Sequence, residues 1–302
     1  MFWILLQIIG CRGGFSTSTS QICPKGLVPI PSKNPVFCIH PYESRITTDQ
    51  KVESQANRLP SINVSLFDAQ EACANTIIDD QSLRLATYRE WVDAGDGQLG
   101  QGGGLYPWGD SKADDKCIVN PPAQPKKWES VQPSGTLDTC ISSFGVYDQI
   151  GNAWEWVDLQ QNASKNAWVS YIQQQGFAVS VSKQQIQLSN RLLPKLRLQT
   201  ICVDMQGLAV DEGVLTVRLN NPISPDCEQG GRGYLWVNFE RRNTQASIPK
   251  EDSLLPIRIV DSKVVWDEER DGEPVGAKVG GAFYSGAEMT LQDFWIGHIP
   301  TF

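Results

Sequence analysis

The chain has 302 residues, enough for one large domain or two smaller ones, and 40% of them are hydrophobic while 20% are charged. A net charge of −8 argues against a nucleic-acid partner, because such a partner requires a basic face. The 26 glycines and 18 prolines predict a loop-rich fold rather than a helical bundle.

The chain begins with a short apolar run, residues 2–9, which cannot span a bilayer but is typical of the core of a secretory signal. Ile8-Ile9-Gly10-Cys11 resembles a bacterial lipobox, in which the cysteine carries the lipid. We therefore predict a signal peptide at 1–10, lipidation of Cys11 and a flexible tether at 11–22. No Lys or Arg precedes the apolar run, so a cleaved secreted protein and a coincidental apolar start stay open as alternatives.

Seven cysteines remain when Cys11 is set aside, and an odd number leaves one of them unpaired. The chain has no CxxC pattern and only two histidines, which argues against a zinc cluster. Disulfides formed in an oxidising compartment are the better interpretation. Proximity along the chain predicts the pairs Cys23–Cys38, Cys117–Cys140 and Cys202–Cys227, and leaves Cys73 as a buried, inert thiol.

The first half of the chain carries signals for one hairpin and two helices. Residues 23–47 alternate apolar and polar positions between Pro and Gly, which predicts a β-hairpin. The pairs Ser65/Asp68 and Thr87/Glu90 are capping-box patterns, and each predicts the start of a helix. Residues 93–143 are rich in Gly, Pro, Asp and Lys and predict long loops that need disulfides or ions to hold them.

Residues 160–275 have a different pattern. Their first part, up to Asn190, is polar and rich in Gln. Four segments with a period of two then follow, each bounded by turn residues: KLRLQTICV, GVLTVRL, YLWVNF and LPIRIV. The spacing predicts an inserted antiparallel β unit.

Six segments together resemble the formylglycine-generating enzyme family, also called sulfatase-modifying factors. In chain order they are FCIHPYESRIT, NVSLFDAQEACA, LRLATYREW, YPWGD, GVYDQIGNAWEWV and VGGAFYSG. The resemblance covers residues 23–159 and 276–302. It implies an α+β fold, a loop-rich variant of the C-type lectin fold, interrupted by a β-rich insertion at 160–275.

The resemblance implies a calcium site in the segment GVYDQIGNAWEW. Carried over from the family position by position, Asp148 and Glu155 supply carboxylate oxygens, and Gly151 and Ala153 supply backbone carbonyls. Calcium takes about six to eight oxygen ligands, and two adjacent carboxylates in an aromatic shell repel each other unless a cation lies between them. The alternative is that both carboxylates are solvated or hydrogen-bonded and only the tryptophans are buried.

The resemblance also implies a lost activity. Oxidases of the family bind copper through two cysteines, the first of which follows a Gly-Gly pattern. Ser285 stands at that place here, and no cysteine follows Cys227. Because Cu(I) selects thiolates over hydroxyls, we expect neither copper nor formylglycine-generating activity. Two isolated histidines, His40 and His298, also make an iron-dependent family oxidase a poor interpretation.

The sequence therefore predicts a non-catalytic binding domain on an exported lipoprotein of the outer membrane or cell surface, with a periplasmic or secreted protein as the alternative. The expected partners are the membrane, through the lipid anchor, and an envelope protein, peptide or glycan that docks on residues 160–275. An enzyme of unknown chemistry that uses Ser285, Tyr284 and Asp293 or Glu288 remains a rival. A structural envelope protein is a third interpretation.

Two short motifs stand outside this scheme. Asn63-Val-Ser65 and Asn162-Ala-Ser164 match the acceptor pattern for N-glycosylation. With a bacterial lipobox in view, we expect neither asparagine to be modified.

Overall fold

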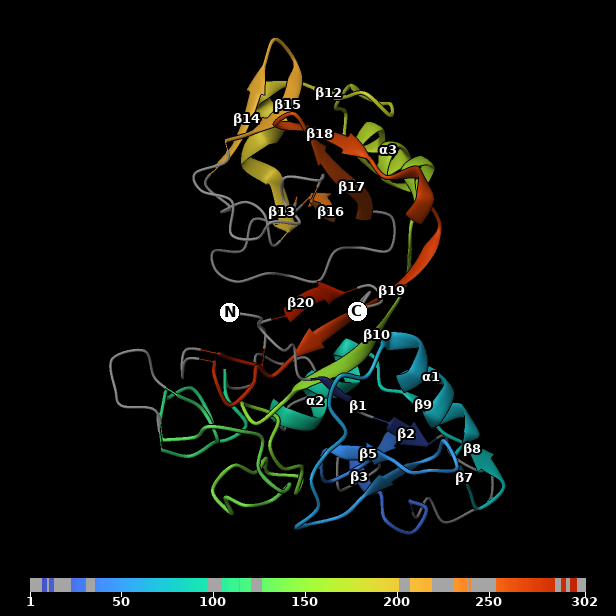
Figure 1. The fold of residues 1–302 in the computed structure, drawn as a ribbon, viewed down its shortest axis with the longest axis vertical. Coiled ribbons are helices and arrows are strands. Elements are labelled where there is room, and N and C mark those ends of the chain that lie inside the picture. The colour runs from blue at the N-terminus through green and yellow to red at the C-terminus, as the bar shows by residue number, and fades with distance from the viewer. Residues whose placement is uncertain are drawn as a thin grey trace. The chain divides into compact units, whose positions relative to one another are not determined.

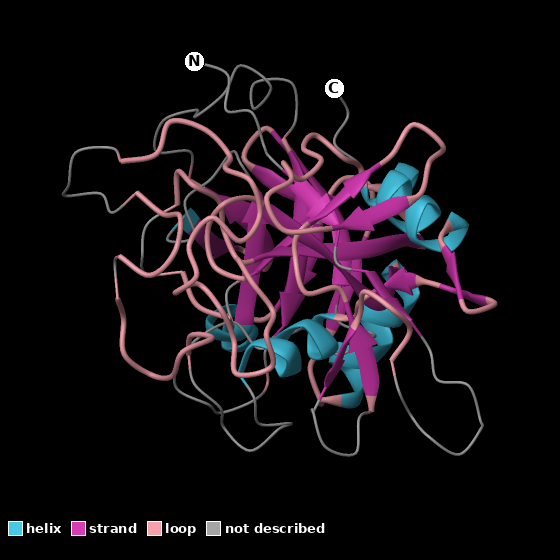
Figure 2. Cartoon of the chain, turned by 90° about the horizontal axis from the view of Figure 1, so that it is seen from below, coloured by secondary structure: helices cyan, strands magenta, loops and turns pink. Residues whose placement is uncertain are grey.

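A computed structural model describes most of the chain. It covers residues 7–9, 11–13, 23–30, 36–96, 105–113, 115–120, 127–200, 207–218, 231–237, 239, 254–285, 289–291 and 294–297. The chain divides into two compact units: residues 1–159 with 276–302 form unit 1, and residues 160–275 form unit 2. Figure 1 labels the elements of both, and Figure 2 shows that strands outweigh helices, so the protein is α+β and mostly sheet.

Unit 1 contains two four-stranded sheets and two short two-stranded ones. The first sheet has the order β1 (Gln7–Ile9), β10 (Trp154–Ala163), β19 (Glu273–Val279) and β20 (Phe294–Gly297). The second has the order β3 (Val28–Ile30), β4 (Phe37–Ile39), β2 (Cys11–Gly13) and β9 (Arg84–Leu85). The short sheets pair β5 (Ser44–Ile46) with β6 (Val52–Ser54), and β7 (Ile77–Ile78) with β8 (Gln81–Ser82).

The described parts of the N-terminal segment are two short strands. Residues 7–9, expected in a signal peptide, form β1 and pair in parallel with β10. Residues 11–13, expected in a tether, form β2, which pairs antiparallel with β4 and β9. The removal of residues 1–10 as a signal peptide stays a prediction.

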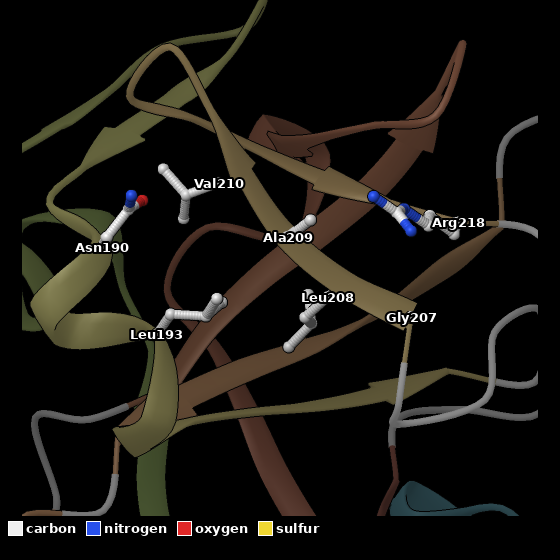
Figure 3. Close-up of a pocket in the computed structure, with 7 residues that line it drawn as sticks. All are labelled: Asn190, Leu193, Gly207, Leu208, Ala209, Val210 and Arg218. Carbon is white, nitrogen blue, oxygen red and sulfur yellow. The ribbon is translucent and has the colours of Figure 1, made fainter.

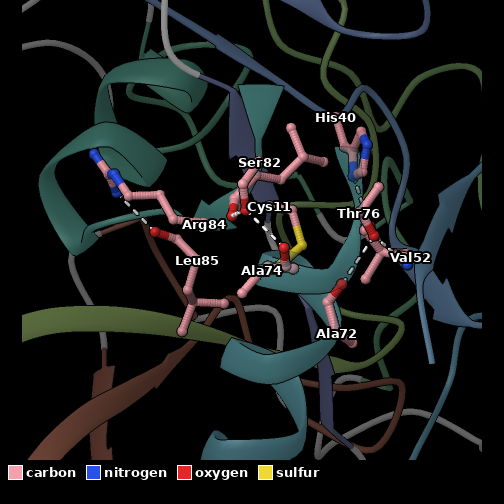
Figure 4. The surroundings of a disulfide bond; sticks show 12 residues. Cys11, His40, Val52, Ala72, Ala74, Thr76, Ser82, Arg84 and Leu85 are labelled. Carbon is pink, nitrogen blue, oxygen red and sulfur yellow. Dashed lines mark hydrogen bonds between the residues drawn. A yellow bond between two sulfur atoms is a disulfide. The ribbon is translucent and has the colours of Figure 1, made fainter. Parts of the chain in front are cut away.

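The structure confirms two of the predicted disulfides and corrects the prediction for Cys73. Cys23–Cys38 and Cys117–Cys140 are disulfides, as their proximity predicts. The third bridge joins Cys11 to Cys73 (Figure 4), so Cys73 is not a free thiol. A sulfur held in a disulfide cannot also carry a lipid, so this bridge and a lipidated Cys11 are alternative states, and the lipidation of Cys11 stays a prediction. The predicted pair Cys202–Cys227 lies outside the described residues.

The hairpin and both helices predicted in the first half of the chain are confirmed. Strands β3 and β4 pair antiparallel within the predicted hairpin region. Helix α1 (Leu66–Asn75) begins after Ser65, whose hydroxyl accepts from the Asp68 N–H while the Asp68 carboxylate accepts from the Ser65 N–H. Helix α2 (Tyr88–Asp96) begins with the same exchange between Thr87 and Glu90, at 3.2 and 2.9 Å.

Unit 2 is built on one antiparallel sheet. Its strands, in spatial order, are β11 (Val179–Val181), β12 (Ile186–Leu188), β15 (Val214–Val217), β18 (Lys263–Trp266), β17 (Leu254–Val260), β16 (Arg232–Val237) and β13 (Leu196–Thr200). Strand β14 (Leu208–Asp211) pairs with β15. Strands β13, β15, β16 and β17 fall in the four period-two segments.

Helix α3 (Lys165–Gln174) lies in the Gln-rich part of unit 2, where the sequence analysis predicted no helix. Trp168 and Ile172, four residues apart, lie on one side of α3 and are both fully buried. They join the leucines, isoleucines and valines of the sheet in one apolar core. The described part of the unit also includes the 3₁₀ turns η1 (Asn190–Lys195) and η4 (Glu268–Arg270).

The described helices are all short. None in that part of the chain combines enough length with enough apolar character to cross a membrane.

Candidate functional site

The loop 145–156 of unit 1 has a backbone that a regular strand could not provide. Asp148, Gly151 and Asn152 all adopt positive φ angles, of 58°, 80° and 51°. A Cβ at Gly151 would lie 2.3 Å from the carbonyl oxygen of Ile118, so only glycine fits this close approach. The Gly151 N–H donates to the Gly280 carbonyl at 2.8 Å, which ties the loop to the VGGAFYSG segment.

Three buried carboxylates gather around this loop, and the sequence analysis identified only two of them. The third is Glu43, which is 4% exposed. Its Oε2 accepts from the Asn152 side-chain amide and from the Ser134 hydroxyl, and its Oε1 accepts from the Ala153 N–H at 3.2 Å. Glu43 therefore fixes the backbone between the two predicted calcium ligands Gly151 and Ala153.

Asp148 and Glu155 are also buried, at 1% and 6% exposure. One Asp148 oxygen, Oδ2, accepts from the Gly135 N–H at 2.6 Å, while Oδ1 finds no hydrogen-bond donor among the described residues. Glu155 accepts from the indole N–H of Trp91 at 3.0 Å. A buried carboxylate oxygen without a donor is costly unless it is protonated or bound to a cation.

The charged forms of these carboxylates are disfavoured. Burial raises the pKa of Asp148 to about 7, against the opposing hydrogen bond from Gly135. Burial raises the pKa of Glu155 to about 8, and the nearby charge of Asp148 adds to this effect. The pKa of Glu43 is raised well above its usual range by burial and then by the charges of Asp148 and Glu155. Without a cation, the cluster is stable only if it retains protons.

The predicted calcium ligands fit the chemistry of a calcium site. Asp148 and Glu155 are oxygen donors in a dry environment, and Asp148 Oδ1 lacks a donor that would compete with a cation. Within the described residues, no three acidic, histidine or cysteine side chains are placed so that they could hold one metal ion together. Two carboxylates supply too few ligands for calcium, so an ion here would need further oxygens, for which the prediction names the backbone carbonyls of Gly151 and Ala153.

The two tryptophans of the motif lie in different environments. Trp156 is fully buried, and its indole N–H donates to the Val64 carbonyl at 2.8 Å. The Lys278 ammonium lies 4.9 Å from the centre of the Trp156 ring, and burial lowers the pKa of this lysine to about 8. Trp154 is half-buried. Trp156 therefore belongs to the core of unit 1.

Ser285, at the place of the family's first copper-binding cysteine, closes a tight turn. Its hydroxyl oxygen accepts from the Ala282 N–H at 2.9 Å, and its own N–H donates to the Ala282 carbonyl at 2.7 Å. The Asn120 N–H donates to the Ser285 carbonyl at 3.1 Å. The serine thus has a structural role that its hydroxyl oxygen and its backbone both support.

Only some residues of the alternative, enzymatic site lie in the described part of the chain. Glu288, Asp293 and His298 lie outside the described residues. His40 is 7% exposed, and its Nδ1 lies 3.0 Å from the Ser44 hydroxyl. Burial lowers the pKa of His40 to about 4, so the ring is neutral at physiological pH. This environment is that of a structural histidine.

Unit 2 contains a separate pocket of about 470 Å³. It lies beside β14 and η1 (Figure 3) and is lined by Asn190, Leu193, Gly207, Leu208, Ala209, Val210 and Arg218. Leucine and valine side chains form its apolar part, and Arg218 contributes an exposed guanidinium. The volume is within the range of small-ligand sites, and the lining suits an anion with an apolar body.

The sequence analysis missed two residues of the carboxylate cluster. Glu43 stands inside a segment quoted for its resemblance, where a lone acid between Tyr42 and Ser44 gives no local signal of a buried role. Asn152 lies inside the calcium motif itself. Its side-chain oxygen accepts from the Gln132 N–H at 2.8 Å, and its amide nitrogen donates to the Gln132 carbonyl and to Glu43. Asn152 therefore joins three loop segments.

Comparison with known proteins identifies the family. The profile of the sulfatase-modifying factor enzyme 1-like domain matches residues 34–199, more than half of the chain. The chain belongs to this family. The matched region extends from unit 1 past residue 159 into unit 2.

One protein with a similar sequence comes from Bos taurus. The chain is 31% identical over 111 residues to a protein of Bos taurus named inactive C-alpha-formylglycine-generating enzyme 2. The similar region covers 35% of this chain and 34% of the bovine protein. The likeness thus spans about a third of the relative's length.

Proposed function

We propose that the protein is a non-catalytic member of its family that serves as an exported binding module. The observation that carries the proposal is Ser285, which occupies the position of a copper ligand and whose hydroxyl oxygen accepts the Ala282 N–H. Support comes from the name of the bovine relative, which marks that protein as inactive. Three disulfides among the described residues support folding in an oxidising compartment. We also propose that unit 1 has the C-type-lectin-like fold of the family.

The lost activity can be tested directly. The purified chain is incubated with copper, oxygen and a cysteine-containing peptide, and aldehyde is detected by mass spectrometry after hydrazide labelling. We expect no aldehyde from the wild-type chain, while an active oxidase of the family labels the peptide in the same assay. Copper-dependent aldehyde formation by the wild-type chain would refute the proposal.

We further propose that Asp148, Gly151, Ala153 and Glu155 bind a structural calcium ion. The support is chemical: two buried carboxylates of raised pKa, one oxygen without a hydrogen-bond donor and a glycine-dependent turn. A bound calcium would neutralise the cluster and fix the loop 145–156. Its role would be stability rather than chemistry.

Titration calorimetry with calcium tests this site. We expect the chelator-treated wild-type protein to bind one ion and Asp148→Asn to lose that binding. Asp138→Asn is a matched control, because Asp138 is exposed and lies ten positions earlier in the same loop region. Equal calcium binding by wild type and Asp148→Asn would place the ion elsewhere.

The pocket of unit 2 is our candidate for the binding face. It combines apolar side chains from β14 and η1 with the guanidinium of Arg218, so it fits an apolar group that carries one negative charge. The dye 8-anilinonaphthalene-1-sulfonate has this chemistry and serves as the probe. We expect Arg218→Gln to weaken dye binding several-fold and Lys263→Gln, an exposed cation of β18, to leave it unchanged. An equal dye affinity in both variants would exclude Arg218 from the binding face.

A further inference from the structure

Two sequons of the chain share one local architecture. In Asn63-Val64-Ser65 the serine is the N-cap of α1, and in Asn162-Ala163-Ser164 the serine is the N-cap of α3. The middle residue of each is buried, Val64 at 5% and Ala163 at 1% exposure. We call this buried middle residue the anchor of its sequon. The asparagine that precedes each anchor is exposed.

Hydrogen bonds of Val64 and of the next residue, Ser65, fix the anchor of the first sequon. The Val64 carbonyl accepts the indole N–H of the buried Trp156 at 2.8 Å, and Ser65 exchanges hydrogen bonds with Asp68. Asn63 has a φ of 58°, a left-handed conformation that asparagine adopts more readily than most residues. The Asn63 side chain thus projects from a fixed turn into solvent.

The second sequon is anchored in the same manner within unit 2. The Ala163 carbonyl accepts the Gly272 N–H, and the Ser164 hydroxyl accepts the Ala167 N–H at 3.4 Å. The following N–H, of Lys165, donates to the Asp271 carboxylate at 2.7 Å. Asn162 is exposed at the end of β10. In the described part of the chain, no hydrogen bond or ion pair holds the side chain of either asparagine.

The disulfides are compatible with the compartment that the modification requires. N-glycosylation of this kind takes place in an oxidising secretory lumen, and three disulfides join described residues of this chain. The reason to expect unmodified asparagines was a lipobox ending at Cys11. In the state with the Cys11–Cys73 bridge, Cys11 carries no lipid, and the lipobox does not argue against the modification.

We propose that Asn63 and Asn162 are N-glycosylation sites, and that their glycans cover the surface at the starts of α1 and α3. A partner then docks elsewhere, because a bulky hydrated glycan occupies the solvent around each helix start. Glycosylation at these positions does not depend on whether unit 2 binds a ligand.

The test uses the full chain expressed behind a secretion leader in a eukaryotic cell line. Peptide mapping after treatment with peptide-N-glycosidase F reports each occupied asparagine as an aspartate. We expect conversion at both positions in the wild-type protein. An unconverted Asn63 or Asn162 overturns the proposal for that site.

Matched variants separate the sequon from the helix cap. Ser65→Asn and Ser164→Asn keep a good, uncharged N-cap but destroy the sequon, whereas Ser65→Thr and Ser164→Thr keep both. We expect each Asn variant to lose the mass of one glycan, seen as a mobility shift on a gel, and each Thr variant to lose none. If Ser65→Asn is not secreted, Asn63→Asp provides the same readout, because it leaves the cap intact and tolerates a positive φ. A glycan that persists in the Asn variants overturns the assignment.

Discussion

The two units are stabilised by different means. Unit 1 has short strands, long loops, three disulfides and a cluster of buried carboxylates. Unit 2 has an eight-stranded antiparallel sheet covered by α3 and an apolar core of Leu, Ile, Val and one Trp. The stability of unit 1 should therefore depend on redox state, pH and ions, while that of the described part of unit 2 should depend strongly on side-chain packing.

The largest expected effect is the loss of the Cys11–Cys73 bridge. The double variant Cys11→Ala/Cys73→Ala should lower the free energy of unfolding by about 4 kcal/mol, because the bridge closes a loop with a sequence separation of 62 residues. Urea denaturation measures the change. The Cys23→Ala/Cys38→Ala variant is the comparison, since its separation of 15 residues predicts a smaller loss, about 3 kcal/mol. A larger loss from the shorter loop would contradict the loop-length argument.

A packing change in unit 2 should come next. Leu255→Ala removes a fully buried side chain from β17 and should cost about 3 kcal/mol. Hydrogen exchange of the peptides of unit 2 reports the effect. Val260→Ala, at the exposed end of the same strand, should cost less than about 0.5 kcal/mol. If both variants behaved alike, packing would not dominate this unit.

The carboxylate cluster should give unit 1 a distinctive pH dependence in the presence of a chelator. The folded-state pKa values of Asp148 and Glu155, about 7 and about 8, lie above the unfolded values of 3.8 and 4.5. The folded state therefore holds more protons in this range, and its stability is lost as the pH rises from about 4 to about 8. Thermal unfolding at a series of pH values should show the decline, and Asp148→Asn should reduce its slope. An equal slope in both proteins would mean that Asp148 does not titrate as described.

Calcium should oppose that decline. A ligand at about 100 times its dissociation constant stabilises the folded state by about 2.7 kcal/mol. We expect this gain near pH 8, where the carboxylates are ionised, and a smaller gain near pH 5. Magnesium at the same concentration is the control, because it demands a tighter octahedral geometry. A gain that is independent of pH would argue against these carboxylates as ligands.

The smallest expected effect concerns the start of α3. Ser164→Ala removes the hydroxyl that accepts the Ala167 N–H and should cost about 1 kcal/mol. Ser170→Ala, on the exposed face of the same helix, should change stability by less than about 0.5 kcal/mol. Urea denaturation of the two variants measures the difference in their free energies of unfolding. An equal loss in both would show that the Ser164 hydroxyl does not stabilise the helix start.

Local chemistry made much of the fold predictable. Ser65 with Asp68 and Thr87 with Glu90 mark helix starts because the same side chains that signal a cap also form it. The period-two segments of unit 2 became strands because a half-buried sheet needs alternating side chains. Helix α3 escaped notice because its apolar side rests mainly on Trp168 and Ile172 among many polar residues.

Features that depend on tertiary structure could not be predicted locally. Nothing in the run 2–9 shows that residues 7–9 pair with β10 far along the chain. Cys11 and Cys73 are distant in sequence, so proximity could not pair them. Glu43 escaped for the same reason, because its role depends on Asn152 and Ala153, more than a hundred positions away.

The Cys11–Cys73 bridge also determines how damage to the chain can be observed. A single peptide-bond break anywhere between these two positions leaves both fragments covalently joined. The clipped molecule would migrate as one species without a reductant and as two with one. Preparations of this protein should therefore be compared under both conditions before they are judged to be intact.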